Sequence, residues 1–447
     1  MRILIVENVW MEGRKLKFFD RLFMTSFSIL PTLYARQLAA VTPKKHFVKV
    51  INERYSNINF DEKYDVVNIN FTTSTAPRAY EIADVFRKKN VTVVLSGLHA
   101  SALPEEAKMH ADCVLIGRGE TSWPKLLDDL EKNNLQPYYY PVHINGLYHV
   151  PPTEIRLPGF VITGAVEATR GCPYRCDFCP EAHIPGGSRF YMRPVDEVVA
   201  EIKSLPQKAF IFYDSSLTIN PDYSKKLFNK MKKLNKKFFC NGNVDVLARD
   251  EELIRLSKEA GCVSWLIGFE SIYQEALDSV GKKTNRVSEY STAVKNIHNH
   301  KMAVIGCFIF GFDTDTSEVF DKTLNAIYEL QLDAVDFCIL TPFPGTPLYK
   351  KLEDEDRILT RDWSKYNMKN VVFEPKNMTA EELLQGVREI YQEFYHPSET
   401  IKRIIKGIGL GFYPFLLSTA RNIIANMNKK LLQPVVLQKT ESDKKRG

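Results

Sequence analysis

The sequence is poor in cysteine, with only 8 among its 447 residues. Secreted domains that depend on disulfides carry a much larger share, so this count excludes a disulfide scaffold and favours a reducing cytoplasm. Five of the cysteines stand singly in apolar stretches, where reduced cysteine behaves as a small core residue. The five expected core cysteines are Cys113, Cys240, Cys262, Cys307 and Cys338.

The sequence also lacks a strong charge imbalance and a long apolar run. A net charge of +6, with 26% charged and 44% hydrophobic residues, is ordinary for a soluble globular chain. No arginine-rich stripe with interleaved aromatic residues is present, so no nucleic-acid partner is expected. The uncharged run at residues 407–420 is too short to span a bilayer. The first residues are typical of a strand rather than a signal peptide, so a cytoplasmic protein is expected.

Three of the cysteines are gathered in one short motif, Cys172-Pro-Tyr-Arg-Cys176-Asp-Phe-Cys179. A tight loop with this spacing can point three thiolates at one small inorganic cluster. Iron–sulfur clusters are normally held by four cysteines, so three leave one iron of a 4Fe–4S cluster open to a substrate or cofactor. Structural zinc needs four closed ligands, and no second cysteine pair follows. A disulfide conflicts with the odd count and the short spacing, which leaves chance burial as the remaining alternative.

The stretch at residues 168–180 resembles the signature of the radical S-adenosylmethionine (SAM) enzymes. The resemblance implies that Cys172, Cys176 and Cys179 hold a 4Fe–4S cluster, and that SAM chelates the fourth iron through its amino and carboxylate groups. An electron from the cluster, supplied by an external donor of the flavodoxin or ferredoxin type, then cleaves SAM to a 5′-deoxyadenosyl radical. Phe178 occupies the family's aromatic position, where the ring lies near the adenine.

Residues 1–140 alternate short apolar strands with helical stretches, and we expect a doubly wound, Rossmann-like parallel sheet there. The expected strands are 2–8, 46–53, 64–71, 91–97 and 113–117, which are rich in Val and Ile and bounded by turn residues. Such sheets bind ligands at the carboxyl ends of their strands. The loops at these ends are rich in hydroxyl groups or glycine, which lets the backbone approach a phosphate or a planar ring.

Together with the cysteine motif, these loops resemble the cobalamin-binding domain that precedes many radical SAM cores. Ser96-Gly-Leu-His99 is similar to that group's glycine–histidine loop, and Gly117-Arg-Gly-Glu120 to its G-x-G-E sequence. The alternative is a domain that has kept the fold and lost the ligand. The residues that the resemblance assigns to cobalamin are Thr72, Thr73, Ser74, Ser96, Gly97, His99, Gly117, Gly119 and Glu120.

The sequence lacks one feature of other cobalamin proteins, the Asp-x-His-x-x-Gly box that supplies a histidine to cobalt. The histidines of the first 140 residues are His46, His99 and His110, and none lies in such a box. His99 is therefore expected near the nucleotide tail of cobalamin, and no histidine is expected on the metal.

A proline-rich connection at residues 141–160 separates the first domain from a second one at residues 161–348. Six strand candidates recur in the second domain with amphipathic helices between them, which indicates a partial (β/α)6 barrel. The candidates are 166–171, 209–214, 238–244, 263–270, 303–310 and 334–340. By analogy with full barrels, the chemistry is expected at the carboxyl ends of the strands, and the cysteine motif follows the first of them.

Polar residues end the other barrel strands and supply the candidates for SAM binding. The family resemblance places the SAM amino group at the end of the second strand and the ribose or carboxylate at the end of the fourth. The candidates are Asp214, Ser215, Asn243, Glu270 and Ser271. Each has an alternative role as a helix N-cap or turn residue, and the second strand lacks a clean Gly-Gly-Glu sequence.

Residues 349–447 are expected to be mainly helical. Residues 361–363 and 371–375 resemble the region after the core in cobalamin-dependent radical SAM enzymes related to the hopanoid methylases and the anaerobic Mg-protoporphyrin ester cyclase. Basic residues flank the run 407–420, so residues 401–432 can lie on a membrane surface with these side chains toward lipid head groups. The alternative is a helix that covers the barrel mouth.

The resemblance implies a cobalamin-dependent radical SAM methyltransferase that methylates a weakly activated carbon. The resemblance implies two uses of SAM: one molecule supplies the methyl group to cobalamin, and the other supplies the radical that removes hydrogen from the substrate. Two alternatives remain, a radical SAM cyclase without methyl transfer and a non-catalytic cobalamin or iron–sulfur sensor. A small-molecule or lipid substrate is expected, and nothing in the sequence identifies it.

Overall fold

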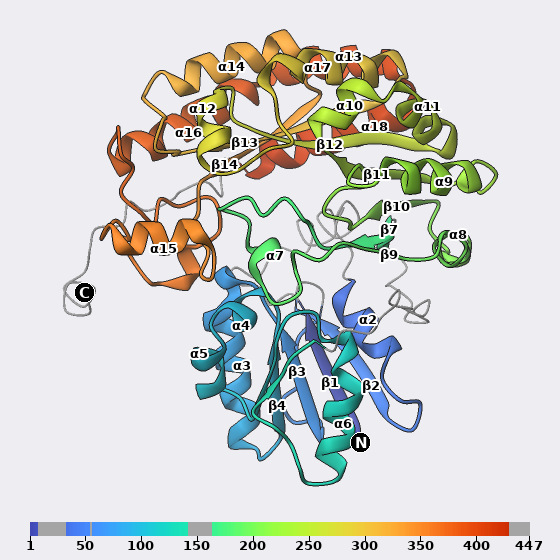
Figure 1. The fold of residues 1–447 in the computed structure, drawn as a ribbon, viewed down its shortest axis with the longest axis vertical. Coiled ribbons are helices and arrows are strands. Elements are labelled where there is room, and N and C mark those ends of the chain that lie inside the picture. Colours follow the sequence, from blue (N-terminus) through green and yellow to red (C-terminus); the bar gives the residue numbers. More distant parts are fainter. Residues whose placement is uncertain (8–32, 54–55, 142–162, 429–447) are drawn as a thin grey trace.

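The computed structural model describes residues 1–7, 33–53, 56–141 and 163–428 of the chain. They form two α/β modules, one above the other in Figure 1. The first module ends with β6 (Tyr138–Tyr139), and the second begins with β7 (Thr163–Val166). Most of the connection expected at 141–160 lies outside the described residues.

The first module is a doubly wound parallel sheet, as predicted. Its strands lie in the order β2-β1-β3-β4-β5-β6, and every neighbouring pair is parallel. The strands before β6 are β1 (Arg2–Glu7), β2 (Phe47–Asn52), β3 (Val66–Asn70), β4 (Thr92–Ser96) and β5 (Cys113–Leu115). The strand order reverses at β1, beside β3, and ligands of such sheets bind at the carboxyl ends near the reversal.

Helices bury both faces of this sheet, which explains why its strands read as nearly continuous apolar runs. The predicted helical face that contains Ala79, Ile82 and Phe86 is buried against the sheet. The helices on that side are α3 (Ala76–Lys88), α4 (Leu98–Ala102) and α5 (Pro104–Met109), and those on the other side are α2 (Tyr34–Ala40) and α6 (Trp123–Glu131).

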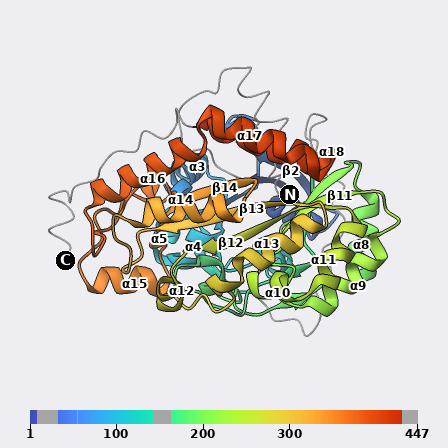
Figure 2. The same ribbon diagram turned by 90° about the horizontal axis from the view of Figure 1, so that it is seen from above.

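The second module is a parallel sheet in chain order, β7-β10-β11-β12-β13-β14, which confirms the predicted open (β/α)6 barrel. Its strands after β7 are β10 (Ala209–Phe212), β11 (Lys237–Gly242), β12 (Cys262–Glu270), β13 (Ala303–Phe310) and β14 (Ala334–Ile339). The outer face is covered by α8 (Val195–Ser204), α9 (Pro221–Met231), α10 (Val244–Arg249), α11 (Glu251–Ala260), α12 (Gln274–Ser279), α13 (Tyr290–Asn299) and α14 (Val319–Leu330), as Figure 2 shows from above.

The first barrel strand is displaced from its expected position. It lies at Thr163–Val166 rather than at 166–171, because the following residues leave the sheet and two of them, Glu167 and Arg170, form a buried ion pair. Residues Thr169–Arg170 (β8) pair instead with the antiparallel β9 (Tyr191–Met192).

The described part of the tail after the barrel is mainly helical, as predicted, with a non-helical stretch between its first two α-helices. Its helices are α15 (Pro347–Asp354), α16 (Ala380–Phe394), α17 (Pro397–Gly407) and α18 (Phe412–Asn428). The uncharged run 407–420 is interrupted at Gly411, which has a φ of +95°. Leu417 of α18 packs against the inner face of the barrel sheet, so α18 has a covering role. No helix in the described part of the chain is long and apolar enough to cross a membrane.

Candidate functional site

The cysteine motif forms a loop directly after β8, at the carboxyl edge of the barrel sheet. The Cys172 N–H donates to the Gly187 carbonyl at 3.0 Å, which folds the loop back on itself. Gly171 precedes the loop with a φ of +78°, and a Cβ at this position would lie 1.9 Å from the Arg189 carbonyl oxygen. Only glycine allows this approach, so the backbone path explains the glycine before the first cysteine.

Two of the three thiols of the motif lie in a poorly solvated environment. Cys176 is buried, and burial raises the pKa of its thiol to about 11 although Lys282 opposes the shift. Burial also raises the pKa of the Cys179 thiol. In the described part of the chain, no group of three His, Cys, Asp or Glu side chains is arranged so that it could hold one metal ion. A cluster with three cysteines takes one thiolate for each of three irons, so this donor set suits a cluster better than zinc.

A buried ion pair lies beside the loop. Lys282 Nζ is 2.8 Å from Oε1 of Glu270, the last residue of β12. Burial disfavours the Lys282 charge, but Glu270 and Cys176 outweigh burial and raise the pKa of Lys282. A Cβ on Gly268 would lie 2.3 Å from Glu270 Oε1, so this glycine leaves room for the carboxylate. The sequence singles out Glu270 as a SAM candidate but not Lys282 as its ion-pair partner, because no local pattern distinguishes this lysine from others.

Asp214, at the end of β10, uses its carboxylate within the protein. It accepts hydrogen bonds from the Ala168 N–H at 3.1 Å, from the Thr169 N–H and from the Thr169 hydroxyl at 2.6 Å. Burial outweighs these hydrogen bonds and, with the charge of Glu167, raises the pKa of Asp214 to about 7. Asp214 therefore fixes the segment between β7 and the cysteine motif, and its part in SAM binding stays a prediction.

The remaining SAM candidates lie along the same edge of the barrel. Ser215 is exposed, and the Ser271 hydroxyl accepts the Tyr273 N–H at 3.1 Å. The Asn243 side chain lies beside Tyr174: burial raises the pKa of this tyrosine, and a hydrogen bond from Asn243 opposes the shift. Phe178 is partly buried against the barrel core. The structure gathers these residues at one edge, while their contacts with SAM stay predictions.

The cobalamin candidates are brought to one edge of the first sheet, at the carboxyl ends of β3, β4 and β5. Thr72 caps the short helix η1 (Thr73–Thr75). Ser101 links the other two loops, because its hydroxyl donates to the Gly97 carbonyl at 2.7 Å and accepts the Gly117 N–H at 2.8 Å. Gly97 has a φ of +111°, and a Cβ there would lie 2.3 Å from a backbone oxygen at the end of β3. Backbone groups and small side chains dominate this edge.

Two of the cobalamin candidates direct their side chains into the protein. The Ser96 hydroxyl is buried and hydrogen-bonds to a side chain of β3. His99 is also buried, with Nε2 3.2 Å from Glu106 Oε1. Trp363, in the short helix η4 (Trp363–Lys365) of the tail, donates to the same carboxylate oxygen at 3.0 Å. The tail thus returns to the first module, a contact that local sequence patterns cannot reveal.

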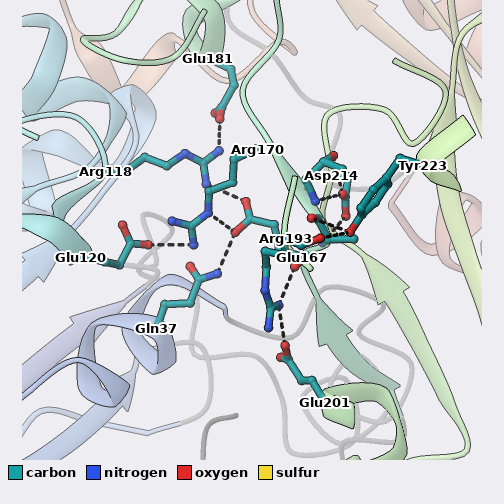
Figure 3. Close-up of polar contacts among 12 residues, drawn as sticks. Gln37, Arg118, Glu120, Glu167, Arg170, Glu181, Arg193, Glu201, Asp214 and Tyr223 are labelled. Atoms are coloured by element: carbon teal, nitrogen blue, oxygen red, sulfur yellow. Dashed lines mark hydrogen bonds and ion pairs between the residues drawn. The ribbon is translucent and has the colours of Figure 1, made fainter. Parts of the chain in front are cut away.

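Glu120 belongs to an ion-pair network that joins the two modules (Figure 3). Arg170 Nη2 lies 3.1 Å from Glu120 Oε1, and Arg170 Nε lies 2.5 Å from Glu167 Oε2. Arg118 Nη1 lies 2.7 Å from Glu167 Oε1, and Nη2 of the same arginine pairs with Glu181. Arg170 is two residues before the cysteine motif and Glu181 two residues after it, so the network holds both ends of the motif.

Glu167 is the centre of this network. Burial favours its neutral form, yet Arg170 and Arg118 together outweigh burial and lower its pKa below the ordinary value. Gln37 Nε2 donates to the Oε2 atom of Glu167 at 2.8 Å. The glutamate is therefore charged, buried and fully dependent on its cationic and polar neighbours.

The modules approach closely beside this network. A Cβ on Gly117 would lie 2.6 Å from the Pro185 carbonyl oxygen. The cavity lined there by Arg118, Arg170 and their neighbours has a volume of about 30 Å³, far too small for a corrin ring. The part of Gly117, Gly119 and Glu120 in cobalamin binding stays a prediction.

The sequence matches a known protein family and is similar to several characterised enzymes. Residues 166–327 match the family described as the radical SAM superfamily, and residues 346–412 match a domain of unknown function, DUF4070. The chain is 31% identical over 357 residues to the bacteriochlorophyllide d C-12(1)-methyltransferase of Chlorobaculum tepidum, covering 76% of this chain and 77% of that protein. It is 26% identical over 396 residues to the anaerobic magnesium-protoporphyrin IX monomethyl ester cyclase of Cereibacter sphaeroides, covering 78% of this chain and 64% of that protein.

A solved structure shares the arrangement of both modules. The chain is similar to the radical S-adenosylmethionine methyltransferase TsrM of Kitasatospora setae, solved with cobalamin and a 4Fe–4S cluster bound. The TM-score is 0.69, with 96% of this chain and 99% of that chain covered at 14% sequence identity. The likeness at this identity is one of fold.

Proposed function

Because the chain belongs to the radical SAM superfamily, we propose that it is a cobalamin-dependent methyltransferase acting on a weakly activated carbon of a small molecule. The observation that carries the proposal is the apposition of two edges. The carboxyl edge of the first sheet lies against the cysteine loop of the barrel, where Arg118 is paired with Glu181. A methyl carrier on the first edge and a radical source on the second would share one substrate. The similarity to a methyltransferase of Chlorobaculum tepidum supports methyl transfer.

The residues at the barrel edge have distinct roles in this proposal. Cys172, Cys176 and Cys179 hold the cluster, and Lys282 offsets part of the negative charge that three thiolates bring. Asn243 lies at the same edge beside Tyr174, and its side-chain amide would donate to SAM. When bound, the cluster and SAM supply a carbon radical, and cobalamin supplies the methyl group.

The first module contributes mainly backbone groups in this proposal. Thr73, Ser74 and Gly97 lie at the carboxyl ends of β3 and β4 and would supply N–H groups and hydroxyls there. The Thr72 N–H already donates to the Thr75 hydroxyl at 3.1 Å, so Thr72 shapes the loop. The side chains of Ser96, His99 and Glu120 already contact the protein, so they hold the loops in place. Because backbone groups and hydroxyls are the groups available, they would bind the polar edge of the cofactor, and no histidine would coordinate its metal.

The test is product counting with anaerobically reconstituted protein, SAM, a reductant and candidate substrates. Two uses of SAM predict equal amounts of S-adenosylhomocysteine and 5′-deoxyadenosine, and a substrate that gains one methyl group by mass. Cys176→Ala should release no 5′-deoxyadenosine, whereas Cys262→Ala, in the barrel core, should retain the reaction. Deoxyadenosine formed without S-adenosylhomocysteine would contradict methyl transfer.

A radical SAM cyclase without methyl transfer is the second candidate. The observation in its favour is the similarity to the ester cyclase of Cereibacter sphaeroides, at 26% identity. In the same experiment a cyclase would release only 5′-deoxyadenosine and leave the number of substrate carbons unchanged. A non-catalytic sensor would cleave no SAM.

We also propose the partners that this chemistry requires. The cluster needs an external one-electron donor, of the flavodoxin or ferredoxin type. The substrate is a small molecule or a lipid, and no nucleic acid takes part. A cytoplasmic location with contact to a membrane through residues 401–432 completes the proposal, although residues 429–432 lie outside the described part of the chain.

A further inference from the structure

The last two described helices expose an unusual number of large apolar side chains. Among the described residues, 7 of the 11 exposed large hydrophobic side chains lie between positions 401 and 423. We call the segment formed by α17, the short helix η5 (Ile408–Leu410) and α18 the apolar hairpin. Its exposed side chains are Ile401, Ile405, Ile408, Phe412, Tyr413, Leu416 and Ile423. Contiguous apolar surface of this kind marks a site of interaction rather than chance exposure.

The spacing of these side chains puts them on one side of the hairpin. Ile401, Ile405 and Ile408 recur at helical intervals of four and three residues, so they share a face. Phe412, just beyond the turn, is 69% exposed, and Ile408 is 63% exposed. The apolar side chains thus meet at the turn between the two helices.

The turn projects from the molecule, and the opposite side of the hairpin is anchored. A Cβ built on Gly409 would meet no atom within 4 Å. Behind the turn, Asn422 Nδ2 donates to the Asp333 carbonyl at 2.9 Å, and the Arg403 guanidinium lies 3.8 Å from the centre of the Phe394 ring. One face of the hairpin is already packed against the barrel, so the exposed apolar side chains are not needed for the core of the protein.

Lysines gather beside the projecting turn, at the amino ends of the barrel strands. Lys237, the first residue of β11, has its Nζ 5.3 Å from the centre of the Tyr413 ring. Lys258 Nζ donates to the Lys301 carbonyl at 2.6 Å. Burial lowers the pKa of Lys258, the charge of Cys262 opposes this shift, and the nearby charges of Lys237 and Lys301 add to it. The backbone of Lys208 adjoins that of Lys237, because the Lys208 carbonyl accepts the Lys237 N–H at 2.9 Å.

This lysine cluster has no carboxylate to balance it. Across the described ranges, none of Lys208, Lys237, Lys258 and Lys301 forms an ion pair with an Asp or Glu side chain. A cluster of like charges next to exposed apolar side chains requires a partner that is both apolar and anionic.

We propose that the apolar hairpin and the lysine cluster dock together on an anionic lipid bilayer. Phe412 and Ile408 enter the boundary between head groups and acyl chains, and the lysines contact lipid phosphates. A second copy of the chain fits less well, because a two-fold contact through the hairpin would bring two uncompensated lysine clusters together. The docking face is at the amino ends of the barrel strands, opposite the cysteine motif, so it anchors the enzyme without covering the site.

The test is co-sedimentation of the full-length protein with vesicles of phosphatidylcholine, alone or with about a third phosphatidylglycerol. We expect binding to the anionic vesicles that weakens at high salt. Phe412→Glu should weaken it roughly ten-fold or more, since it removes a buried aromatic ring from the lipid and adds a negative charge. Lys237→Gln combined with Lys258→Gln should abolish the preference for anionic vesicles.

The matched control is Met109→Glu. Met109 is 68% exposed, nearly the same as Phe412, but it lies on α5 of the first module. This variant should bind vesicles like the unaltered protein, and unchanged melting temperatures of both variants would show that their folds are intact.

Three outcomes overturn the proposal. They are absence of vesicle binding by the unaltered protein, equal weakening by Met109→Glu and Phe412→Glu, and a dimer in light scattering that Phe412→Glu dissociates while vesicle binding persists. Vesicle binding needs neither cofactor nor substrate, so it is judged separately from methyl transfer.

Discussion

Replacing Arg170 with Met should destabilise the protein far more than the loss of an ordinary ion pair. The guanidinium lies 3.1 Å from Glu120 and 2.5 Å from Glu167, and the side chains of all three residues are at most 4% exposed. Methionine keeps the length of the side chain and removes its charge. Glu120 then stays buried without its ion pair, and Glu167 depends on Arg118 and Gln37 alone. Breaking a buried pair in this way costs about 3–5 kcal/mol of the free energy of unfolding.

A double-mutant cycle measures this coupling. The variants Arg170→Met, Glu120→Gln and the double variant are unfolded in urea and followed by far-UV circular dichroism and tryptophan fluorescence. The double variant should recover roughly 1–3 kcal/mol relative to Arg170→Met, because it removes the uncompensated charge. The control is Arg361→Met, which removes a half-exposed pair with Glu353 at 3.0 Å and should cost at most about 1 kcal/mol.

The pH dependence gives a second measurement on the same variants. The pKa of Glu167 is lowered in the folded protein, so its contribution to stability is present above the ordinary pKa of glutamate and is lost as the pH falls below it. This acid-side loss should be smaller in Arg170→Met, which has already lost one of the two cations. The reasoning is refuted if Arg170→Met costs no more than Arg361→Met, or if Glu120→Gln restores nothing.

Three further predictions concern the site. Cys176→Ala should lose the four-iron cluster, as measured by iron and sulfide content and absorbance, whereas Cys262→Ala should keep it at a cost of about 1 kcal/mol in stability. The pKa of Asp214 is raised from 3.8 to about 7, so its contribution to stability is full at pH values below 3.8 and is lost as the pH rises through 7. Asp214→Asn should remove this change, which is on the order of 4 kcal/mol, from the pH profile of unfolding, and an unaltered profile would refute the assignment. In protein loaded with cobalamin, we expect the cofactor to have lost its own dimethylbenzimidazole ligand and to have gained no histidine, since His99 is paired with Glu106. Electron paramagnetic resonance of the Co(II) form should therefore show no nitrogen superhyperfine splitting, and splitting from an axial nitrogen would contradict this.

The fold could be predicted from the sequence because both sheets are parallel and buried. Buried parallel strands have sequences that are short apolar runs. In the barrel, the order of the strands in the sheet is also their order along the chain. The exceptions are the first barrel strand, which is displaced, and the two-residue strands β6, β8 and β9, which were not predicted. Glu167 and Arg170 follow β7 and are buried as an ion pair, and an ion pair leaves no apolar pattern.

The site could be predicted only where its parts are local. The three cysteines lie within eight residues, so their spacing is visible, and glycines mark the loops of the first sheet. Lys282 and Trp363 act through partners that are distant in sequence, and a single sequence does not reveal such pairs. The prediction of five core cysteines was correct for three of them: Cys113, Cys240 and Cys262 are buried. Cys307 of β13 and Cys338 of β14, which are neighbouring strands, are only half-buried.

The first module is held by the second at two separate places. Arg118 pairs with Glu181, just after the cysteine motif, and Trp363 of the tail hydrogen-bonds at 3.0 Å to Glu106. These two contacts come from segments that are far apart in the sequence of the second module, so non-covalent contacts join the modules at two places. Two polypeptides, one ending at residue 141 and the other beginning at residue 163, should therefore assemble when co-expressed. Each half could then be isotopically labelled or varied separately and recombined with an unaltered partner.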